Sequence, residues 1–292
     1  MTRSLVDKAI CAARAAWYQA YESRRLRRER RRHWHMYLHA TVYAPLPLAS
    51  FLRPFVTVYI PTHNRADLLL TRSLPSVIKQ TYKNLEIIVA AHGCTDDTVR
   101  RVRWLMPTAH IYGPPEDQRI RLLQVARTRT YPPTAENHWL AGPVVPANAA
   151  LVAAKGDWIM RLDDDDRLMP DAVEKLLRFA QQGDFEFVSA AYQTPNGTVW
   201  DDGEVPPAGG VQTWLYRSYL KFMHFNGSSW RKAHCRVNDT DLVDRFRKAG
   251  VRMGYLSQVV CYIEPRPGET EIGSKAYRRD KEGKEKHFAF RN

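Results

Sequence analysis

The sequence predicts an α/β fold in which helices flank a mainly parallel β-sheet. Three short apolar segments rich in β-branched residues, at residues 55–60, 85–91 and 157–162, have the length and composition of buried strands. Strands that alternate with helical segments form βαβ units, whose strands run parallel. The chain has 292 residues, 44% hydrophobic and 26% charged, so it can bury a core and does not resemble a disordered chain.

The segment before the first strand is expected to be helical and then extended. Apolar residues recur at roughly helical spacing within residues 4–38, namely at Leu5, Ile10, Ala13, Ala16, Trp17 and Tyr21. Prolines at positions 45, 47 and 54 predict an extended linker over residues 44–54. The body of the protein is therefore expected to begin at Phe55.

Strand and helix signals then alternate along the body. Further strands are predicted at residues 119–125 and 185–191. Helices are predicted from Asp67 to about Gln80, from Asp96–Asp97 onward, over 146–154, after Pro170, and over 239–249, which Gly250 closes. The segments 126–142 and 192–210 are rich in turn residues and are expected to be irregular.

The positive charge is concentrated at the two ends of the chain. Residues 1–50 hold ten Lys/Arg against three Asp/Glu, and residues 274–292 hold seven against three, while the whole chain carries +13. Seven arginines lie between positions 24 and 32 alone. Such ends suit anionic membrane surfaces or nucleic acid, and the alternative is a solvated basic helix and a tail.

The cysteines and the hydropathy pattern exclude several classes of protein. Cys11, Cys94, Cys235 and Cys261 are scattered and form no CxxC pair, which argues against a disulfide scaffold and a structural zinc site. No run of about 18 apolar residues and no secretory signal is visible. The expected location is cytoplasmic, with the basic N-terminus resting on the inner face of the membrane as an option.

Four consecutive aspartates, Asp163 to Asp166, are the strongest chemical signal. They follow the apolar strand at 157–162, and ligands of open α/β sheets bind at the carboxyl ends of the strands. A divalent cation would remove the repulsion between these carboxylates, and hard oxygen ligands suit Mg²⁺ or Mn²⁺. The alternative is a solvated acidic loop that caps the next helix.

Three blocks in order carry a resemblance to a known family. They are VTVYIPTHNR (56–65), NLEIIVAAHGCTDDT (84–98) and PANAALVAAKGDWIMRLDDDDRLMPDAVEKLL (146–177). Together they resemble the pattern of glycosyltransferase family 2. The resemblance implies a GT-A fold, with a nucleotide-sugar half at about 55–166 and an acceptor half at about 167–265, between a basic extension (1–54) and a basic tail (266–292). It also implies inverting transfer of a sugar from a nucleotide sugar, with Mn²⁺ or Mg²⁺ as cofactor.

The resemblance implies roles for the donor side. Residues of the loop after the first strand line the nucleoside pocket in this family, and here they are Pro61, Thr62, Asn64 and Arg65. Asp165 and Asp163 match the acids of the DxD signature and would hold the metal, with Asp163 or Asp164 facing the ribose or the metal. Asn148 is expected to touch the donor or to pack its helix.

One residue departs from the family pattern on the donor side. The family usually has an aspartate where this chain has His92, and that acid commonly binds the base, often uracil. A histidine donates or accepts a hydrogen bond according to its tautomer. A UDP-sugar is the expected donor, with the base left open by this substitution.

The segment RVNDTDLVDRFRKAGVRMGYL (236–256) resembles the acceptor-side motif of the same family, with Asn238 in place of the usual glutamate. Asp239 then matches the general base, and Asp241 is its backup. Inverting transfer needs such a carboxylate, since a base must take the proton of the acceptor hydroxyl. The alternative for Asp239 is a helix N-cap.

The acceptor is the least determined part of the prediction. Trp139, His224 and Trp230 are weak acceptor-side candidates, because aromatic rings stack on sugar faces. An envelope saccharide or a lipid-linked glycan is the expected acceptor. Nucleic acid is the second option, because the arginines could contact phosphate. A non-catalytic module that binds a nucleotide sugar or saccharide is the third.

Overall fold

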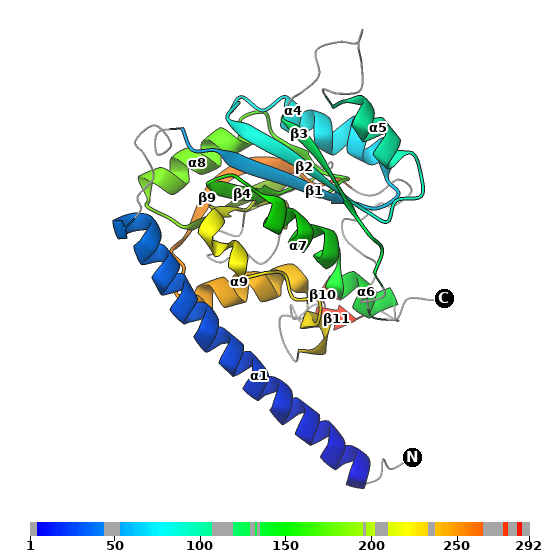
Figure 1. Cartoon of the computed structure of the whole chain (residues 1–292), viewed down its shortest axis with the longest axis vertical. Helices are drawn as coiled ribbons and strands as arrows, with labels where there is room; N and C mark the ends of the chain where they lie inside the picture. Colours follow the sequence, from blue (N-terminus) through cyan, green and yellow to red (C-terminus); the bar gives the residue numbers. More distant parts are fainter. Residues whose placement is uncertain are drawn as a thin grey trace.

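The computed structural model describes residues 5–43, 53–106, 119–128, 132, 135–194, 197–201, 210–232, 237–264, 277–279 and 285–287. Within them, one mixed nine-stranded sheet forms the centre of the body (Figure 1). Its strands are β1 (Val56–Thr62), β2 (Leu85–His92), β3 (Ile120–Val125), β4 (Trp158–Arg161), β5 (Arg167–Leu168), β6 (Phe187–Gln193), β7 (Val199–Trp200), β8 (Leu215–Arg217) and β9 (Met253–Tyr262).

The sheet has a parallel half and a mixed half. The strand order is β3-β2-β1-β4-β8-β6-β9-β5, and β7 pairs with β6. The first four strands in this order are parallel, with Val56 opposite both Leu85 and Trp158. Strand β8 then runs antiparallel to β4 and to β6, whereas β9 runs parallel to β6. The parallel half confirms the sequence prediction, but strands β5, β7, β8 and β9 were not predicted.

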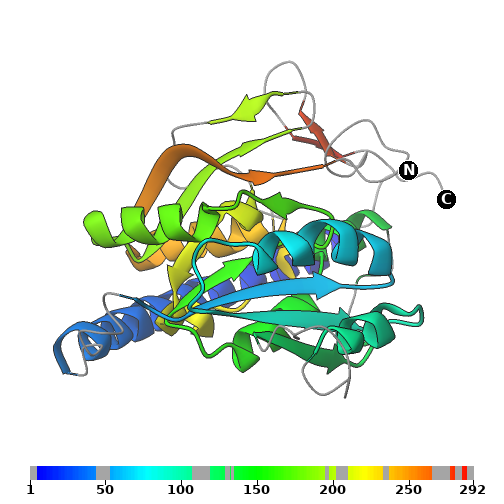
Figure 2. The ribbon, with the colours of Figure 1, turned by 90° about the horizontal axis from the view of Figure 1, so that it is seen from above.

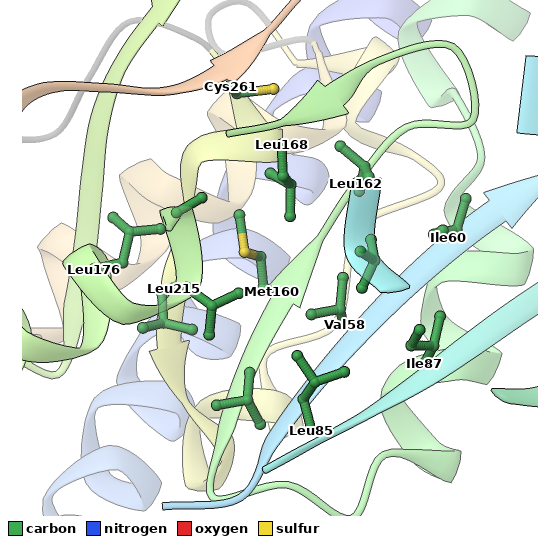
Figure 3. Close-up of a cluster of buried hydrophobic side chains, with 14 of the residues drawn as sticks. Val58, Ile60, Leu85, Ile87, Met160, Leu162, Leu168, Leu176, Leu215 and Cys261 are labelled. Atoms are coloured by element: carbon green, nitrogen blue, oxygen red, sulfur yellow. The ribbon is translucent and has the colours of Figure 1, made fainter. Parts of the chain in front are cut away.

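Helices cover both faces of the sheet. Helices α4 (Leu74–Ile78), α5 (Thr98–Trp104) and α8 (Ala172–Gln182) pack on one face, and α7 (Val144–Ala153) and α9 (Asn238–Ala249) on the other. Alternate strand residues enter the two cores, as expected for a pleated sheet. Figure 3 shows the first core, to which Val58, Ile87 and Met160 from neighbouring strands and Leu176 of α8 all belong. Tyr59 points to the opposite core.

The paired strands β6 and β9 bend strongly in the mixed half (Figure 2). Their register shifts on either side of Ala191, between Ala190 and Tyr192. A β-bulge adds a residue on one strand and increases the local twist and bend. The bend carries the end of β9 to β5, so that this edge of the sheet folds over the residues that follow β4.

Two predicted segments differ from the structure. The helix expected from Asp67 to Gln80 consists of α3 (Ala66–Leu68), a π turn over Leu69–Ser73, and α4. Pro75 lies in the first turn of α4 and has no N–H to donate, so the regular helical ladder cannot pass through it. The segment 126–142, expected to be irregular, contains helix α6 (Ala135–Ala141).

Helix α9 ends as predicted. Gly250 adopts a φ of 89°, and its N–H donates to the carbonyl of Arg247 while Val251 N–H donates to that of Phe246. Glycine adopts this left-handed conformation without steric strain because it has no Cβ. This ending sets the entry into β9 and fixes the position of the first turn of α9, which carries Asp239.

The basic N-terminal segment forms one helix, α1 (Leu5–Leu38), followed by a π turn over His39–Tyr43. It packs along α9, and its N-terminal end extends beyond the rest of the molecule (Figure 1). None of the helices in the described ranges is long and apolar enough to cross a membrane. The expected linker lies mostly outside those ranges, as does most of the tail, where β10 (Tyr277–Arg279) pairs with β11 (Glu285–His287). The division into three segments stays a prediction.

Candidate active site

The four aspartates lie at the carboxyl end of β4, beside the carboxyl end of β1. A cleft of about 170 Å³ opens there, lined by Pro61, Thr62, His63, Arg65, Pro143, Pro146, Arg161, Asp163, Asp164 and Asp165. Because β1 and β4 are parallel neighbours, the loops that follow them meet at one edge of the sheet. The fold therefore brings together the first and third sequence blocks, which lie about a hundred residues apart in the chain.

Arg65 joins the loop after β1 to the acidic loop. Its guanidinium donates to Oδ1 of Asp164 at 2.8 Å and to Oδ2 of Asp165 at 3.0 Å. Burial raises the pKa of Asp164 to about 6, while Arg65 acts in the opposite direction. The guanidinium is thus a resident counter-charge for two of the aspartates.

Arg161 plays a similar part on the other side of the cluster, and the sequence analysis did not single it out. It is the last residue of β4, it is buried, and its Nε and Nη2 both donate to one oxygen of Asp163, at 2.9 and 2.7 Å. Its guanidinium also lies over the ring of Phe225, 5.4 Å from the centroid. An arginine inside an otherwise apolar strand, two residues before an acid, is the local signal that could have revealed this pair.

Asp239 lies within electrostatic reach of this pair. It occupies the first turn of α9 and is half-buried, and its Oδ1 accepts the N–H of Thr240. Burial raises its pKa, Arg161 opposes this shift, and Asp163 adds to it. A carboxylate whose pKa is raised toward neutrality takes up a proton more readily than an ordinary aspartate. The fold thus brings the acceptor-side acid next to the cleft.

Asp166 holds two segments of the chain together through its carboxylate. It is buried, which raises its pKa well above the ordinary value, and its carboxylate accepts bonds from the side chain of Gln212 and the N–H of Glu264. It therefore ties the acidic loop to the end of β9. It does not cap the next helix, as one interpretation of the sequence had it, because α8 begins at Ala172 after Asp171.

Asn64 joins two loops instead of lining the cleft. It adopts a left-handed φ of 51°, its Oδ1 accepts the N–H of Thr95, and its Nδ2 donates to the Thr95 hydroxyl. Pro61, Thr62 and Arg65 do line the cleft, as the donor-side prediction requires. The side chain of Asn64 acts on the site through the loop that it holds.

His92 is buried at the end of β2, beside a second histidine. His63 Nδ1–H donates to the carbonyl oxygen of His92 at 2.6 Å, and His63 lines the cleft. Burial lowers the pKa of His92, and the neighbouring His63, Arg127 and His138 add to this effect. His92 is therefore neutral at pH 7, and among the described lining residues it is His63 that faces the cleft.

Asn148 holds the acceptor side in place. Its Nδ2 donates to the carbonyl of Phe225, and its Oδ1 accepts the N–H of the same residue. Both groups of the amide are thus used to pin α7 to the segment that contains Phe225. Of the two roles that the sequence left open for Asn148, the structure shows packing.

The weak acceptor-side candidates are not among the described residues that line the cleft. His224 is exposed, and its carbonyl accepts a bond from Arg245. Trp230 is half-buried, with the guanidinium of Arg231 over its ring at 4.8 Å. Trp139 belongs to α6, and its side chain falls outside the described part of the structure. An acceptor role for these three side chains stays a prediction.

Asp241, the backup base, is fully buried in an ion-pair network. Arg245 Nε donates to its Oδ2 at 2.9 Å, and Lys232 pairs with its other oxygen. Glu22 and Glu29 of α1 bind the same two cations. The carboxylate of Asp241 thus helps to join α9 to α1, and because it is buried it is not accessible to an acceptor.

The described residues contain no group of three or more His, Cys, Asp or Glu side chains that converge on a metal site. Mg²⁺ is held by one or two carboxylates when substrate phosphates and water supply the other ligands. Asp163 and Asp165 both line the cleft, and the side chain of Asp163 is 32% exposed. The residues present therefore fit a divalent cation that binds together with a diphosphate.

The sequence model of a known family, described as "Glycosyl transferase family 2", matches residues 57–131 and 135–246. The chain belongs to glycosyltransferase family 2. This confirms the resemblance noted in the sequence, and the two matched ranges include the acidic loop and most of β1 and α9.

Curated relatives of this family-2 chain are bacterial proteins. It is 31% identical over 156 residues to a chondroitin synthase of Pasteurella multocida. This alignment covers 52% of this chain and 13% of the relative. It is 31% identical over 130 residues to "GalNAc(5)-diNAcBac-PP-undecaprenol beta-1,3-glucosyltransferase" of Campylobacter jejuni, covering 44% and 36%. The alignments thus span well under two thirds of these relatives.

Solved structures show that the family-2 chain has the GT-A fold. Residues 1–349 of S. aureus TarS in complex with UDP-GlcNAc superpose with a TM-score of 0.56 at 19% identity, covering 77% of this chain and 62% of that one. The mannosyltransferase PcManGT of Pyrobaculum calidifontis, in complex with GDP-Man and Mn²⁺, gives 0.53 at 20%, covering 72% and 56%.

Proposed function

We propose that this chain is an inverting, metal-dependent glycosyltransferase that moves a sugar from a nucleotide sugar to an acceptor hydroxyl. The observation that carries the proposal is the arrangement of Asp239 on α9 beside Arg161 and Asp163 at the end of β4. In this proposal Asp239 serves the acceptor and the aspartates after β4 serve the donor. A direct displacement at the sugar needs this division.

Each acid then has a separate role. Asp239 accepts the proton of the acceptor hydroxyl, and its raised pKa favours that uptake. Asp163 and Asp165 would hold the Mn²⁺ or Mg²⁺, which stabilises the negative charge on the leaving diphosphate. Arg65, which donates to Asp164 and Asp165, would supply a positive charge beside the diphosphate. Pro61 and Thr62, which line the cleft, would contact the nucleoside.

We infer that the donor is a UDP-sugar and the acceptor an envelope saccharide or a lipid-linked glycan. TarS binds UDP-GlcNAc, and the Campylobacter relative is named for an undecaprenol-linked acceptor, which supports this choice. The reaction would then take place in the cytoplasm, at the inner face of the membrane. His92 and His63 are expected to contact the base.

Nucleotide-dependent stabilisation tests the donor site. We expect the melting temperature to rise with UDP in the presence of Mn²⁺ and to rise less without it, because a ligand that binds only the folded state stabilises it. GDP, dTDP, CDP and ADP are the comparison set. A shift with another nucleotide would correct the base, and no shift with any of them would contradict the donor site.

A pair of variants on one helix tests the base. Asp239→Asn should lower kcat by about 10²- to 10⁴-fold while nucleotide binding is retained, since it removes only the proton acceptor. Asp244→Asn is the matched control, because Asp244 lies on the same helix and pairs with Arg247 and Lys248 instead. Equal activity of D239N and the wild type would refute the assignment.

A further inference from the structure

Helix α1 is oriented against the usual rule for a helix packed on a protein body. Such a helix normally turns its apolar stripe inward and its charges outward. In α1, the described side chains that are most deeply buried are Glu29 and His33, and none of its described apolar side chains reaches that degree of burial. Large aromatic side chains lie on the outside instead: Trp17 is 67% exposed and Trp34 is 60% exposed.

The two sides of α1 differ in charge, because its described acids face the body together with Arg25, whereas Arg24, Arg28 and Arg31 are exposed. Glu22 and Glu29, its acids whose side chains are described, both point at the body, where they pair with Lys232 and Arg245. His33 points the same way and bonds to Glu186 at 2.8 Å. The inward side is therefore neutralised by the body and holds the helix at a fixed rotation.

The outward side carries a continuous basic and aromatic stripe. We define the α1 stripe as the residues that recur every three or four positions on the exposed side, namely Trp17, Tyr21, Arg24, Arg28, Arg31 and His35. All six are exposed, and within the described part of the chain none of the three arginines forms an ion pair. Trp17 stacks on Tyr21 with ring centroids 5.7 Å apart, and Trp34 flanks the other end.

We propose that the α1 stripe docks this protein on an anionic lipid surface. The arginines complement anionic headgroups, and tryptophan and tyrosine favour the interface between headgroups and acyl chains. The stripe is straight and spans about 27 Å at the rise of an α-helix, which suits a flat surface. Helix α1 reaches the edge of the molecule, where the body does not cover this side (Figure 1).

Other occupants fit the stripe less well. A second copy of the chain would bring the same arginines face to face, and like charges at an interface oppose association. Duplex nucleic acid would match the arginines but would leave Trp17 and Trp34 without stacking partners, because its bases are already stacked. A lipid surface uses both the charges and the rings.

The test is sedimentation of the full chain with vesicles, without donor or acceptor. We expect binding to mixed phosphatidylglycerol and phosphatidylcholine vesicles, weaker binding at high salt, and none to pure phosphatidylcholine. The triple variant R24Q/R28Q/R31Q should bind on the order of 100-fold more weakly. The matched control K83Q/K155Q/R178Q removes the same charge from exposed positions elsewhere and should bind as the wild type does.

A second variant tests the rings. W17A/W34A should also bind more weakly, and it should lose the blue shift that vesicles cause in the tryptophan emission of the wild type. Unchanged melting temperatures verify the fold of every variant, since the substituted side chains are exposed. Equal loss of binding in the triple variant and its control would overturn the proposal, as would equal binding to neutral vesicles.

Two further outcomes separate this proposal from its alternatives. Retardation of duplex DNA that depends on the three arginines, with no vesicle binding, would replace the lipid by nucleic acid. Because no sugar transfer is measured, failure of lipid docking leaves the proposed transferase activity intact. Loss of that activity in D239N likewise does not test lipid docking by the α1 stripe.

Discussion

Two arginines balance the acidic loop after β4. Arg65 reaches it from the loop after β1, and Arg161 from the last position of β4 itself. Burial alone would drive the buried aspartates toward their neutral forms. At Asp164, Arg65 opposes this effect, and the pKa of that carboxyl still rises to about 6. The local chemistry of the site is therefore set by pairs of residues, and not by the aspartates alone.

The pH dependence of stability should reveal the protonation of the Asp164 carboxyl. Its folded pKa of about 6 lies above the ordinary value of 3.8, so the folded state binds the extra proton between these pH values. Stability contributed by this group therefore falls as pH rises from about 4 to 6, by about 3 kcal/mol in total. Urea unfolding with chelator present should show this decline in the wild type but not in D164N. Parallel pH profiles of the two proteins would contradict it.

Arg161→Gln should change the pH dependence of catalysis. Without the guanidinium, Asp239 loses the group that opposes the rise in its pKa. The acidic limb of the kcat/KM profile should therefore move to higher pH by on the order of one unit, a size typical of removing a nearby opposite charge. Arg217→Gln is the control, because Arg217 is stacked on Trp158 away from Asp239. An unshifted limb would show that Arg161 does not act on the base.

At the scale of elements, α1 and α9 are joined by a buried ionic interface. Arg245 is 3% exposed and binds both Asp241 on its own helix and Glu29 on α1. Buried ion pairs of this kind specify one relative placement of two helices more than they add net stability. The interface thus explains how a highly charged helix holds one fixed rotation on the body.

Glu29→Ala should destabilise the protein by about 3–5 kcal/mol, because it leaves part of the charge of a buried arginine without its partner. Urea unfolding measures the loss. Glu29→Ala combined with Arg245→Met removes both charges and should recover part of it. If the double variant loses at least as much free energy of unfolding as the two single variants lose together, Glu29 and Arg245 are not coupled in this way.

At the scale of the whole molecule, α1 is built into the half of the body that holds Asp239 and is not an appendage. It supplies partners to Glu186 at the start of β6, to Lys232, and to Arg245 on α9. These three lie in the half of the body that also holds Asp239. Removing α1 would therefore expose buried charges beside the candidate base.

Deletion of residues 1–43 should lower the melting temperature by roughly 10 °C, the size expected when about 3–5 kcal/mol is lost from a domain of this length. Differential scanning calorimetry measures it. Adding E186Q to the truncated chain should restore part of the loss, because it removes a carboxylate left without His33. An unchanged melting temperature would show that the helix does not stabilise the body.

The sequence allowed most of the parallel half to be predicted, along with the position of the acidic loop. Short apolar segments rich in β-branched residues marked β1, β2 and β4, and Asp163 to Asp166 followed β4 as expected. The predictions were less accurate where tertiary contacts override local preference. Asn148 and Asp241 were expected near the chemistry, but their side chains are used to hold the segment at Phe225 and helix α1. Arg161 was missed although an arginine in an apolar strand two residues before an acid is a local signal, because that signal does not show that the side chain is buried against Asp163.

Local patterns by themselves determined the family, the βαβ rhythm and the end of α9 at Gly250, because each depends on residues close together in the chain. Only the tertiary structure decided which side of α1 faces solvent and which carboxylates receive an arginine. Arg65 and Asp164 are 99 residues apart, and Arg245 and Glu29 are 216 apart. Such pairs form only when the tertiary fold places their elements side by side, and no short-range periodicity encodes that placement.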